Sequence, residues 1–134
     1  MPSTTIPEKY LDLFTAKKAL ASIATVMPDG SPQVTPVWFD YTNGKIRINT
    51  ARGRVKAKNM KVGSKVALAI VDPDNAYRHL TIRGPVIAED EKEADAHIDS
   101  LAKKYLNQDK YPFRTPGEQR VTYVIEPASV HVMG

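Results

Sequence analysis

The sequence predicts a β-rich α+β fold, a small antiparallel barrel with helices at its ends and gaps. Six or seven short segments have strand patterns, and only three have helical periodicity. Asp-Gly and Asn-Gly pairs between the early strand segments are strong hairpin signals. The chain has 134 residues, the length of one ordinary domain, so residues 1–134 are expected to form a single unit.

The first part of the chain is expected to form a short helix and an antiparallel meander. Residues 7–15 have apolar side chains at helical spacing after a proline suited to a first turn. Residues 20–26, 33–41 and 45–50 have strand patterns and are joined by the turn sequences MPDGSP and TNG. These three strands are therefore expected to be neighbours.

A short helix and two strands are expected next. Residues 54–62 regain helical spacing and carry a basic face. Residues 65–71 are continuously apolar, which is typical of a strand buried on both faces. Residues 77–89 alternate as a strand until Gly84 and Pro85, where the sequence predicts a bulge or bend.

The last part of the chain is expected to hold the longest helix and two strands. Residues 90–106 begin like a capping box, Asp90 with Glu93, and carry apolar side chains on one face. His97 lies inside this acidic helix and is interpreted as an ordinary surface residue. After a loop, residues 120–134 supply the final strands.

The composition excludes several kinds of chemistry. The chain has no Cys, which excludes disulfides and thiolate nucleophiles, and its three His have no metal-ligand spacing, so no metal site is expected. Rossmann, P-loop and nucleophile-elbow patterns are missing from the sequence. No apolar run approaches the roughly 20 residues of a membrane span, and no signal peptide is readable, so a cytoplasmic protein without membrane contact is expected. If the protein is an enzyme, a bound cofactor is expected to carry the chemistry.

Positive charge gathers in one segment of the chain. Residues 52–65 hold six Lys or Arg and no acid, within a net charge of +4. A strand is expected to end at Asn49 and Thr50 and a helix to begin near Arg54, so free backbone N–H groups would face the same point as these side chains. An anion site and a solvated helix face explain this spacing about equally well. Because the charges are confined to one turn and helix, with no aromatic-rich strands, a nucleic-acid partner is not expected.

A second candidate cluster lies in the strand segment before the basic one. Pro36 removes a ladder donor, which places it at a sheet edge, at a bulge or where a ligand meets the backbone. Trp38 and Phe39 are interpreted as core residues. Residues 77–79 could line a cleft, although a plain strand start explains them more simply.

In its order of segments the chain resembles the pyridoxamine 5′-phosphate oxidase-like superfamily of split β-barrel flavin-binding proteins. Within that superfamily it is most similar to the small deazaflavin-dependent oxidoreductases of the PPOX class. The matching segments are ASIATVMPDGSPQVTPVWF, INTARGRVKAKNMKVGSKVALAI, LTIRGPVIAED, the acidic helix and VIEPASVHVM. The resemblance implies a split β-barrel with flanking helices that forms a homodimer, with two equivalent cofactor sites at the subunit interface.

The resemblance also implies roles for individual residues. Six residues at the start of the basic segment are candidates for holding the phosphate of coenzyme F420 or of FMN: Thr50, Arg54, Lys56, Asn49, Lys58 and Asn59. Five residues of the preceding strand are candidates for lying along the ring system: Gln33, Thr35, Pro36, Val37 and Trp38. Tyr77 and His79 would reach the ring from the partner subunit.

The activity that the resemblance implies is hydride transfer between the cofactor ring and a small organic molecule such as an enone or imine. A non-catalytic cofactor carrier or sensor is the alternative. The sequence ends at SVHVMG without the Arg-x-His element of vitamin B6 oxidases, so oxidation of pyridoxamine phosphate is not expected. The dense positive charge favours F420, whose oligoglutamate tail adds carboxylates to the phosphate.

Overall fold

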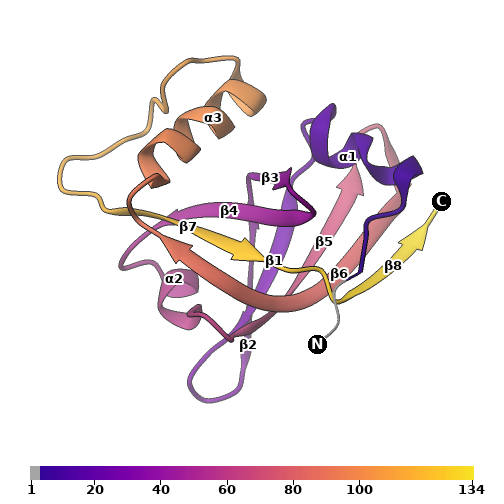
Figure 1. Ribbon diagram of the computed structural model, residues 1–134, viewed down its shortest axis with the longest axis horizontal. Coiled ribbons are helices and arrows are strands. Elements are labelled where there is room, and N and C mark those ends of the chain that lie inside the picture. Colours follow the sequence, from indigo (N-terminus) through magenta and orange to yellow (C-terminus); the bar gives the residue numbers. More distant parts are fainter. Residues whose placement is uncertain (1–3) are drawn as a thin grey trace.

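Antiparallel strands dominate the computed structural model, which describes residues 4–134 (Figure 1). The strands within this range are β1 (Ala21–Val26), β2 (Pro32–Val37), β3 (Phe39–Thr42), β4 (Lys45–Ala51), β5 (Lys65–Asp72), β6 (Asn75–Asp90), β7 (Arg120–Ile125) and β8 (Ser129–Met133). The helices are a 3-10 turn η1 (Glu8–Tyr10), α1 (Asp12–Thr15), α2 (Val55–Asn59) and α3 (Ala94–Leu106). No helix in this described range is long and apolar enough to cross a membrane.

The strand order is β2-β1-β5-β6-β7-β4-β3, and β8 pairs with β6. The 16-residue strand β6 joins the two halves of the sheet, because its first part pairs with β5 and β8 while its last part pairs with β7. The ladder with β7 shifts register between Val86 and Ala88, close to the bend expected at Gly84 and Pro85. This bent strand between two half-sheets confirms the α+β class and the split β-barrel.

The expected strand over residues 33–41 is broken, so the meander prediction was wrong at this point. The two hairpins are confirmed, since β1 pairs with β2 and β3 pairs with β4. Between Val37 and Phe39 the chain leaves the strand at Trp38, and β2 and β3 lie at opposite ends of the strand order. Pro36 has no N–H to donate and β2 is an edge strand, so ending β2 at Val37 leaves no strand partner on its outer side without a hydrogen bond.

The strand β5 is covered on one face only within the single chain. Val66, Leu68 and Ile70 are buried in the core, whereas Ala67 and Ala69 are half-buried and Val71 is exposed. The prediction of burial on both faces is therefore wrong for one chain by itself. The outer face of β5 is left apolar and partly open.

The longest helix begins four residues later than predicted, and its expected capping box does not form. Asp90 is still paired in β6, where it lies opposite Thr122. Its Oδ1 accepts hydrogen bonds from the backbone N–H groups of Lys92 and Glu93, so Asp90 turns the chain ahead of α3 instead of capping it. The expected apolar face of the helix is confirmed, because its side chains are buried against the sheet: Ala94, Ile98, Leu101, Ala102 and Tyr105.

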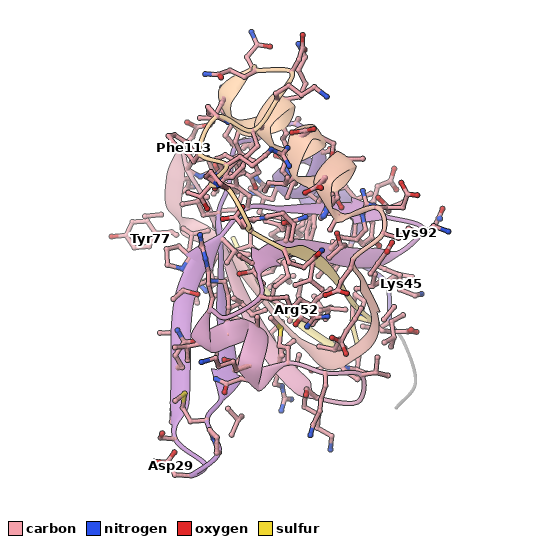
Figure 2. The ribbon with its side chains drawn as sticks, turned by 90° about the vertical axis from the view of Figure 1, so that its left-hand side faces the viewer. Asp29, Lys45, Arg52, Tyr77, Lys92 and Phe113 are labelled. Atoms are coloured by element: carbon pink, nitrogen blue, oxygen red, sulfur yellow. The ribbon has the colours of Figure 1, made fainter. Side chains whose placement is uncertain are left out.

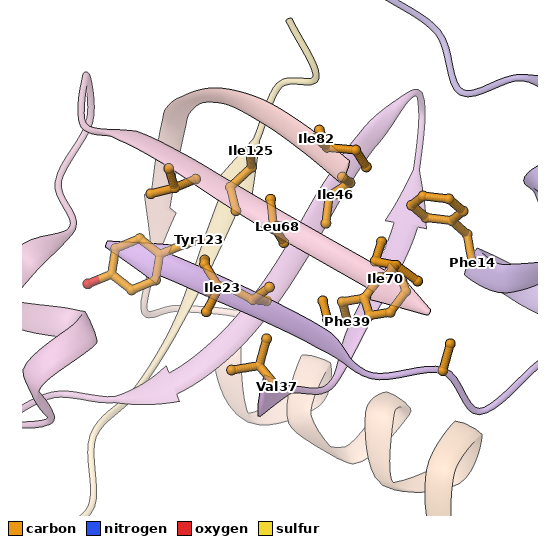
Figure 3. Close-up of a cluster of buried hydrophobic side chains, with 14 of the residues drawn as sticks. Phe14, Ile23, Val37, Phe39, Ile46, Leu68, Ile70, Ile82, Tyr123 and Ile125 are labelled. Atoms are coloured by element: carbon orange, nitrogen blue, oxygen red, sulfur yellow. The ribbon is translucent and has the colours of Figure 1, made fainter. Parts of the chain in front are cut away.

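Side chains from the strands of both half-sheets and from α1 pack into one core (Figure 3). Ile23, Leu68 and Ile125 lie at its centre, and Phe14 of α1 closes one end with its ring edge against Phe39. A smaller cluster under α3 joins Ile98, Leu101 and Tyr105 to Trp38 and Tyr111. The two clusters fix α3 and the β2–β3 break relative to each other.

Lys104 connects α3 to the main core, and its titration is expected to make the free energy of unfolding depend on pH in the alkaline range. Its Nζ donates to the carbonyl oxygens of Phe14 and Phe39 at 3.0 and 2.8 Å. Burial lowers the pKa of Lys104 to about 8, although the charge of Asp40 opposes this shift. Above this pH the neutral amine keeps two N–H donors, enough for both carbonyls.

We expect the stability contributed by Lys104 to rise from about pH 8 towards the ordinary lysine pKa of about 10.4. In that window the unfolded chain binds a proton that the folded chain does not, so unfolding becomes less favourable as pH increases. Urea unfolding of the natural chain and of Lys104→Met should be compared at several pH values from 7 to about 10. A difference between the two proteins that stays constant over this range would contradict the expectation.

Candidate functional site

Four segments that are distant in sequence supply most of the lining of an open cavity of about 250 Å³. They are the end of β2 with the break that follows it, the start of α2, the α3 helix, and the loop 107–119 that leads into β7. The lining residues are Leu20, Pro36, Val37, Trp38, Asn49, Arg54, Lys56, Ile98, Tyr111, Phe113 and Arg120. The cavity therefore has a cationic side and an aromatic side.

The cationic side carries more positive charge than its neighbours balance. Within residues 4–134 no acidic side chain lies within salt-bridge distance of Arg54 or Lys56, and Arg120 pairs with Glu118 at 3.1 Å. Burial lowers the pKa of Lys56, and the nearby charges of Arg54 and Arg120 lower it further. An anion placed among these three cations would relieve that repulsion.

Arg120 is a site residue that sequence reasoning missed. It is only 3% exposed, and its Nε donates to Asn49 Oδ1 at 2.9 Å. Its guanidinium lies over the ring of Tyr111, 5.2 Å from the centroid. The pairing of Arg120 with Ala51 in the β4–β7 ladder brings it to the basic segment, and the sequence holds no local signal of that long-range pairing.

The aromatic side is built on Trp38, at the break between β2 and β3. Its ring stacks on Tyr105 of α3 with centroids 5.2 Å apart, and Tyr111 meets it edge-on at 5.9 Å. Phe113 packs against Tyr111 and is 63% exposed at the rim (Figure 2). Arg114 ties this loop to Asp99 of α3, so the aromatic side is held by ion pairs at the surface.

Six of the thirteen predicted site residues line the cavity: Pro36, Val37, Trp38, Asn49, Arg54 and Lys56. Lys58 is exposed on α2 outside it. Gln33 and Asn59 lie in a neighbouring cluster, where the Thr25 hydroxyl donates to Gln33 Oε1 and accepts from Asn59 Nδ2, both at 3.1 Å. That cluster ties α2 to the β1–β2 hairpin.

Two predicted threonines share an unusual property. The Oγ1 atoms of Thr35 and Thr50 are buried and have no hydrogen-bond partner among residues 4–134. Alternation along β4 places Thr50 on the face of Ile46 and Ile48, opposite to Asn49. Buried hydroxyls are nearly always bonded, so these two are exceptions among the described residues, and neither threonine lines the cavity.

Tyr77 and His79 are not brought to the cavity within one chain. Tyr77 is 82% exposed and projects outward from the structure (Figure 2), and His79 lies on β6 between Val71 of β5 and Met133 of β8. Arg78, which lies between them in the sequence, also stays outside the cavity and binds acidic side chains.

Arg78 has a structural role that its position in the sequence does not reveal. It bonds to Asp12 at 2.6 Å and to Asp72 at 2.8 Å. Hydrogen bonds from Lys17, from the backbone of Asp74 and from Arg78 hold the pKa of Asp72 far below its ordinary value. This network ties the N-terminal segment to the β5–β6 turn.

The basic segment is less uniform than its sequence indicates, because Arg52 points away from the cavity. Its Nη1 donates to Glu89, near the end of β6, at 3.1 Å, and its Nε donates to Glu91, just after that strand, at 2.8 Å. It also donates to the Tyr123 hydroxyl at 3.0 Å. Glu89 and Glu91 therefore neutralise Arg52, whereas the charges of Arg54 and Lys56 remain available at the cavity.

The interpretation of His97 as a surface residue was wrong. His97 is 4% exposed beneath α3, where Asp40, Thr122 and Asn49 surround its two ring nitrogens. A histidine in an acidic helix has the sequence pattern of a solvated side chain, and only the packing of α3 over β4 and β7 buries it. Within residues 4–134 no three His, Asp or Glu side chains lie close enough together to hold a metal ion.

Together, the bent β6, the two half-sheets and a cavity between β2, α2 and α3 define a split β-barrel protein. The chain belongs to the pyridoxamine 5′-phosphate oxidase family, whose sequence model matches residues 6–134. No curated protein matches it by sequence.

Solved structures support the same family and fold. An F420 reductase is 32% identical over 94% of this chain and 98% of that chain, with a TM-score of 0.80. HupZ of Group A Streptococcus is 19% identical over 96% of this chain and 94% of its own, with a TM-score of 0.66. An FAD binding protein from Mycobacterium smegmatis is 13% identical over 96% and 95% of the two chains, with a TM-score of 0.62. The last two similarities concern the fold alone.

Proposed function

We propose that this protein is an oxidoreductase that binds coenzyme F420 or FMN in the cavity and transfers hydride to or from a small organic molecule. The observation that carries the proposal is the pairing of three cations, Arg54, Lys56 and Arg120, with an aromatic side in one cavity. A phosphorylated planar ring has the matching shape and charge. The similarity to an F420 reductase supports the same assignment.

The residues present fit such a cofactor. Arg54, Lys56 and Arg120 would hold the phosphate by charge-assisted hydrogen bonds. Pro36 and Val37, at the end of the edge strand β2, and Trp38 line the cavity and would hold the ring there. The bound ring supplies the hydride chemistry, while the protein binds it, orients it and excludes water. The exposed Lys58 and Lys61 of the basic segment favour F420 over FMN, because the glutamate tail of F420 adds carboxylates.

A homodimer is part of the proposal. The outer face of the half-sheet that holds β1 and β5 is apolar and partly open, with small side chains such as Ala24, Ala67 and Ala69. A shallow depression of about 380 Å³ lies on this face. A second copy of the chain would cover it, and in that dimer Tyr77 and His79 are proposed to reach the partner's cofactor. Measuring the molar mass of the protein in solution tests the dimer. A mass of one chain at micromolar concentration would contradict it.

Absorbance titrations with F420 and with FMN, done separately, test the cofactor assignment. We expect saturable binding, with tighter binding of F420, and heat stabilisation by the bound cofactor. A protein that binds neither would overturn the proposal. The reduced complex should then be mixed with enones and imines, where faster reoxidation than in the absence of protein supports a reductase. Binding without such acceleration would instead indicate a carrier or sensor.

A further inference from the structure

A chain of hydrogen-bonded side chains runs beneath α3 and ends at the cavity. His97 Nε2 lies 3.0 Å from Asp40 Oδ2, and His97 Nδ1 lies 3.2 Å from Asn49 Nδ2. Asn49 Oδ1 then accepts the 2.9 Å bond from Arg120 Nε. The chain connects β3, α3, β4 and β7, and His97, Asn49 and Arg120 are all buried. None of these contacts depends on a ligand.

The donors and acceptors in this chain fix the direction of the Asn49 amide and favour one tautomer of His97. A guanidinium can only donate, so the Asn49 atom facing Arg120 must be the carbonyl oxygen. The amide nitrogen of Asn49 therefore faces Ala94 O at 2.8 Å and His97 Nδ1. Because an amide nitrogen only donates, the 3.2 Å contact is a hydrogen bond when His97 Nδ1 accepts, and the Thr122 hydroxyl can then donate to the same nitrogen at 2.9 Å. The ring proton then lies on Nε2 and is donated to the carboxylate of Asp40.

Asp40 is well placed to hold that proton position. Arg47 binds its carboxylate through two bonds of 2.8 and 2.7 Å. Burial would raise the pKa of Asp40, but the hydrogen bonds from His97 and Arg47 lower it below its ordinary value. Asp40 is thus a fixed acceptor, and Nδ1 of His97 stays an acceptor towards Asn49. The Thr122 hydroxyl, 2.9 Å from Nδ1, contributes a second partner there.

Arg120 depends on the direction of the Asn49 amide. Its bonds use Nε, towards Asn49, and Nη1, towards Glu118 at 3.1 Å. Nη2 has no hydrogen bond to any residue in the range 4–134 and is free for a ligand of the cavity. If the amide turned over, its NH₂ group would face the N–H of Arg120, and two donors would oppose each other. Arg120 would then lose the contact that fixes its guanidinium.

We propose that His97 is a positioning residue, whose Nδ1, together with the carbonyl oxygen of Ala94, fixes the direction of the Asn49 amide and thereby places Arg120 for anion binding. The inference rests on the proposed function for the ligand, but the placement of Arg120 belongs to the free protein. His97 itself does not line the cavity and acts through its two neighbours.

Two substitutions separate the two ring nitrogens of His97. His97→Asn places a carbonyl oxygen near the position of Nδ1, so it keeps an acceptor for Asn49 and gives up Asp40. His97→Gln reaches the position of Nε2, so it keeps a donor for Asp40 and gives up the acceptor. If His97 had a purely structural role, the loss of the Arg120 placement in each variant would parallel that variant's loss of stability. Positioning through Nδ1 predicts that the Gln variant loses the placement of Arg120 and the Asn variant keeps it.

The first measurement is NMR on the free protein. In the natural chain the ring nitrogens of His97 should show an unprotonated Nδ1 and a protonated Nε2, and the Arg120 Nε–H should exchange slowly. We expect His97→Gln to lose this protection and His97→Asn to retain it. His131→Gln, at an exposed histidine on β8, is the matched control and should change neither signal. The opposite protonation in the natural chain, or full protection in His97→Gln, would overturn the proposal.

The second measurement is the affinity for F420 and FMN in a double-mutant cycle with Arg120→Ala. His97→Gln should weaken binding roughly tenfold in the natural chain and have little effect when Arg120 is already Ala. Equal losses in both backgrounds would show that His97 does not act through Arg120. If the natural chain binds neither cofactor, the proposed function fails, while the exchange of the Arg120 Nε–H still decides the role of His97.

Discussion

The double variant Arg54→Ala/Lys56→Ala is expected to bind F420 and FMN at least roughly 100-fold more weakly than the natural chain, because each hydrogen bond from a cation to an anion contributes about 1.5–3 kcal/mol. Both side chains line the cavity, and neither has an acidic partner within residues 4–134. Their charges are therefore available to a ligand. Absorbance or fluorescence titration at constant ionic strength measures the loss.

The matched control for this prediction removes two charges elsewhere. Lys9 and Lys92 are exposed and lie outside both the cavity and the basic segment, so Lys9→Ala/Lys92→Ala should bind both cofactors like the natural chain. Equal affinity of the Arg54 and Lys56 double variant and the natural chain would contradict the site. Equal losses in both double variants would point to a general charge effect instead.

The same double variant is expected to unfold no more easily than the natural chain. The lowered pKa of Lys56 means that its charged form is less favourable in the folded than in the unfolded protein. Removing that charge therefore takes away a cost to folding at neutral pH. A lower urea midpoint for the variant would show that the two cations support the fold itself. Residues that bind a ligand often lower the stability of the protein without that ligand.

The variant Gly84→Ala is expected to destabilise the fold by about 3 kcal/mol, at the upper end for overpacking. A Cβ atom at Gly84 would lie 1.8 Å from the carbonyl oxygen of Glu126. The backbone cannot move away easily, because Glu126 N–H donates to Pro85 O and Ala128 N–H donates to Arg83 O on either side of the contact. The close approach lies where β6 bends between the two half-sheets.

Gly30→Ala is the control for Gly84→Ala. Gly30 has a φ of +89° in the β1–β2 hairpin and no atom within 4 Å of an added Cβ, so only backbone strain acts, costing about 1–2 kcal/mol. Urea unfolding of the three proteins gives the comparison. If Gly84→Ala costs no more than Gly30→Ala, the close contact with Glu126 does not limit this bend. An insoluble Gly84→Ala protein beside a soluble control agrees with the prediction.

The predictable parts of this protein are those set by neighbouring residues. Asp-Gly and Asn-Gly pairs fix the two hairpins, and helical spacing identifies the buried face of α3, because both signals lie within a few residues. Pro36, Asn49 and Arg54 are candidates from their own positions, in a strand that a proline interrupts and at the start of the basic helix, whereas Trp38 and Lys56 become candidates through the family resemblance. The order of segments then indicated the family.

The sequence by itself determined the two hairpins, the buried face of α3, the family and the place of Arg54 and Lys56 in the candidate site. The tertiary structure alone decided that Arg120 joins that site, that Arg52 leaves it and that His97 is buried. The physical reason is that each of these three side chains is placed by partners far away in the chain. Arg120 needs the β4–β7 ladder, Arg52 needs the acidic end of β6, and His97 needs α3 packed over the sheet.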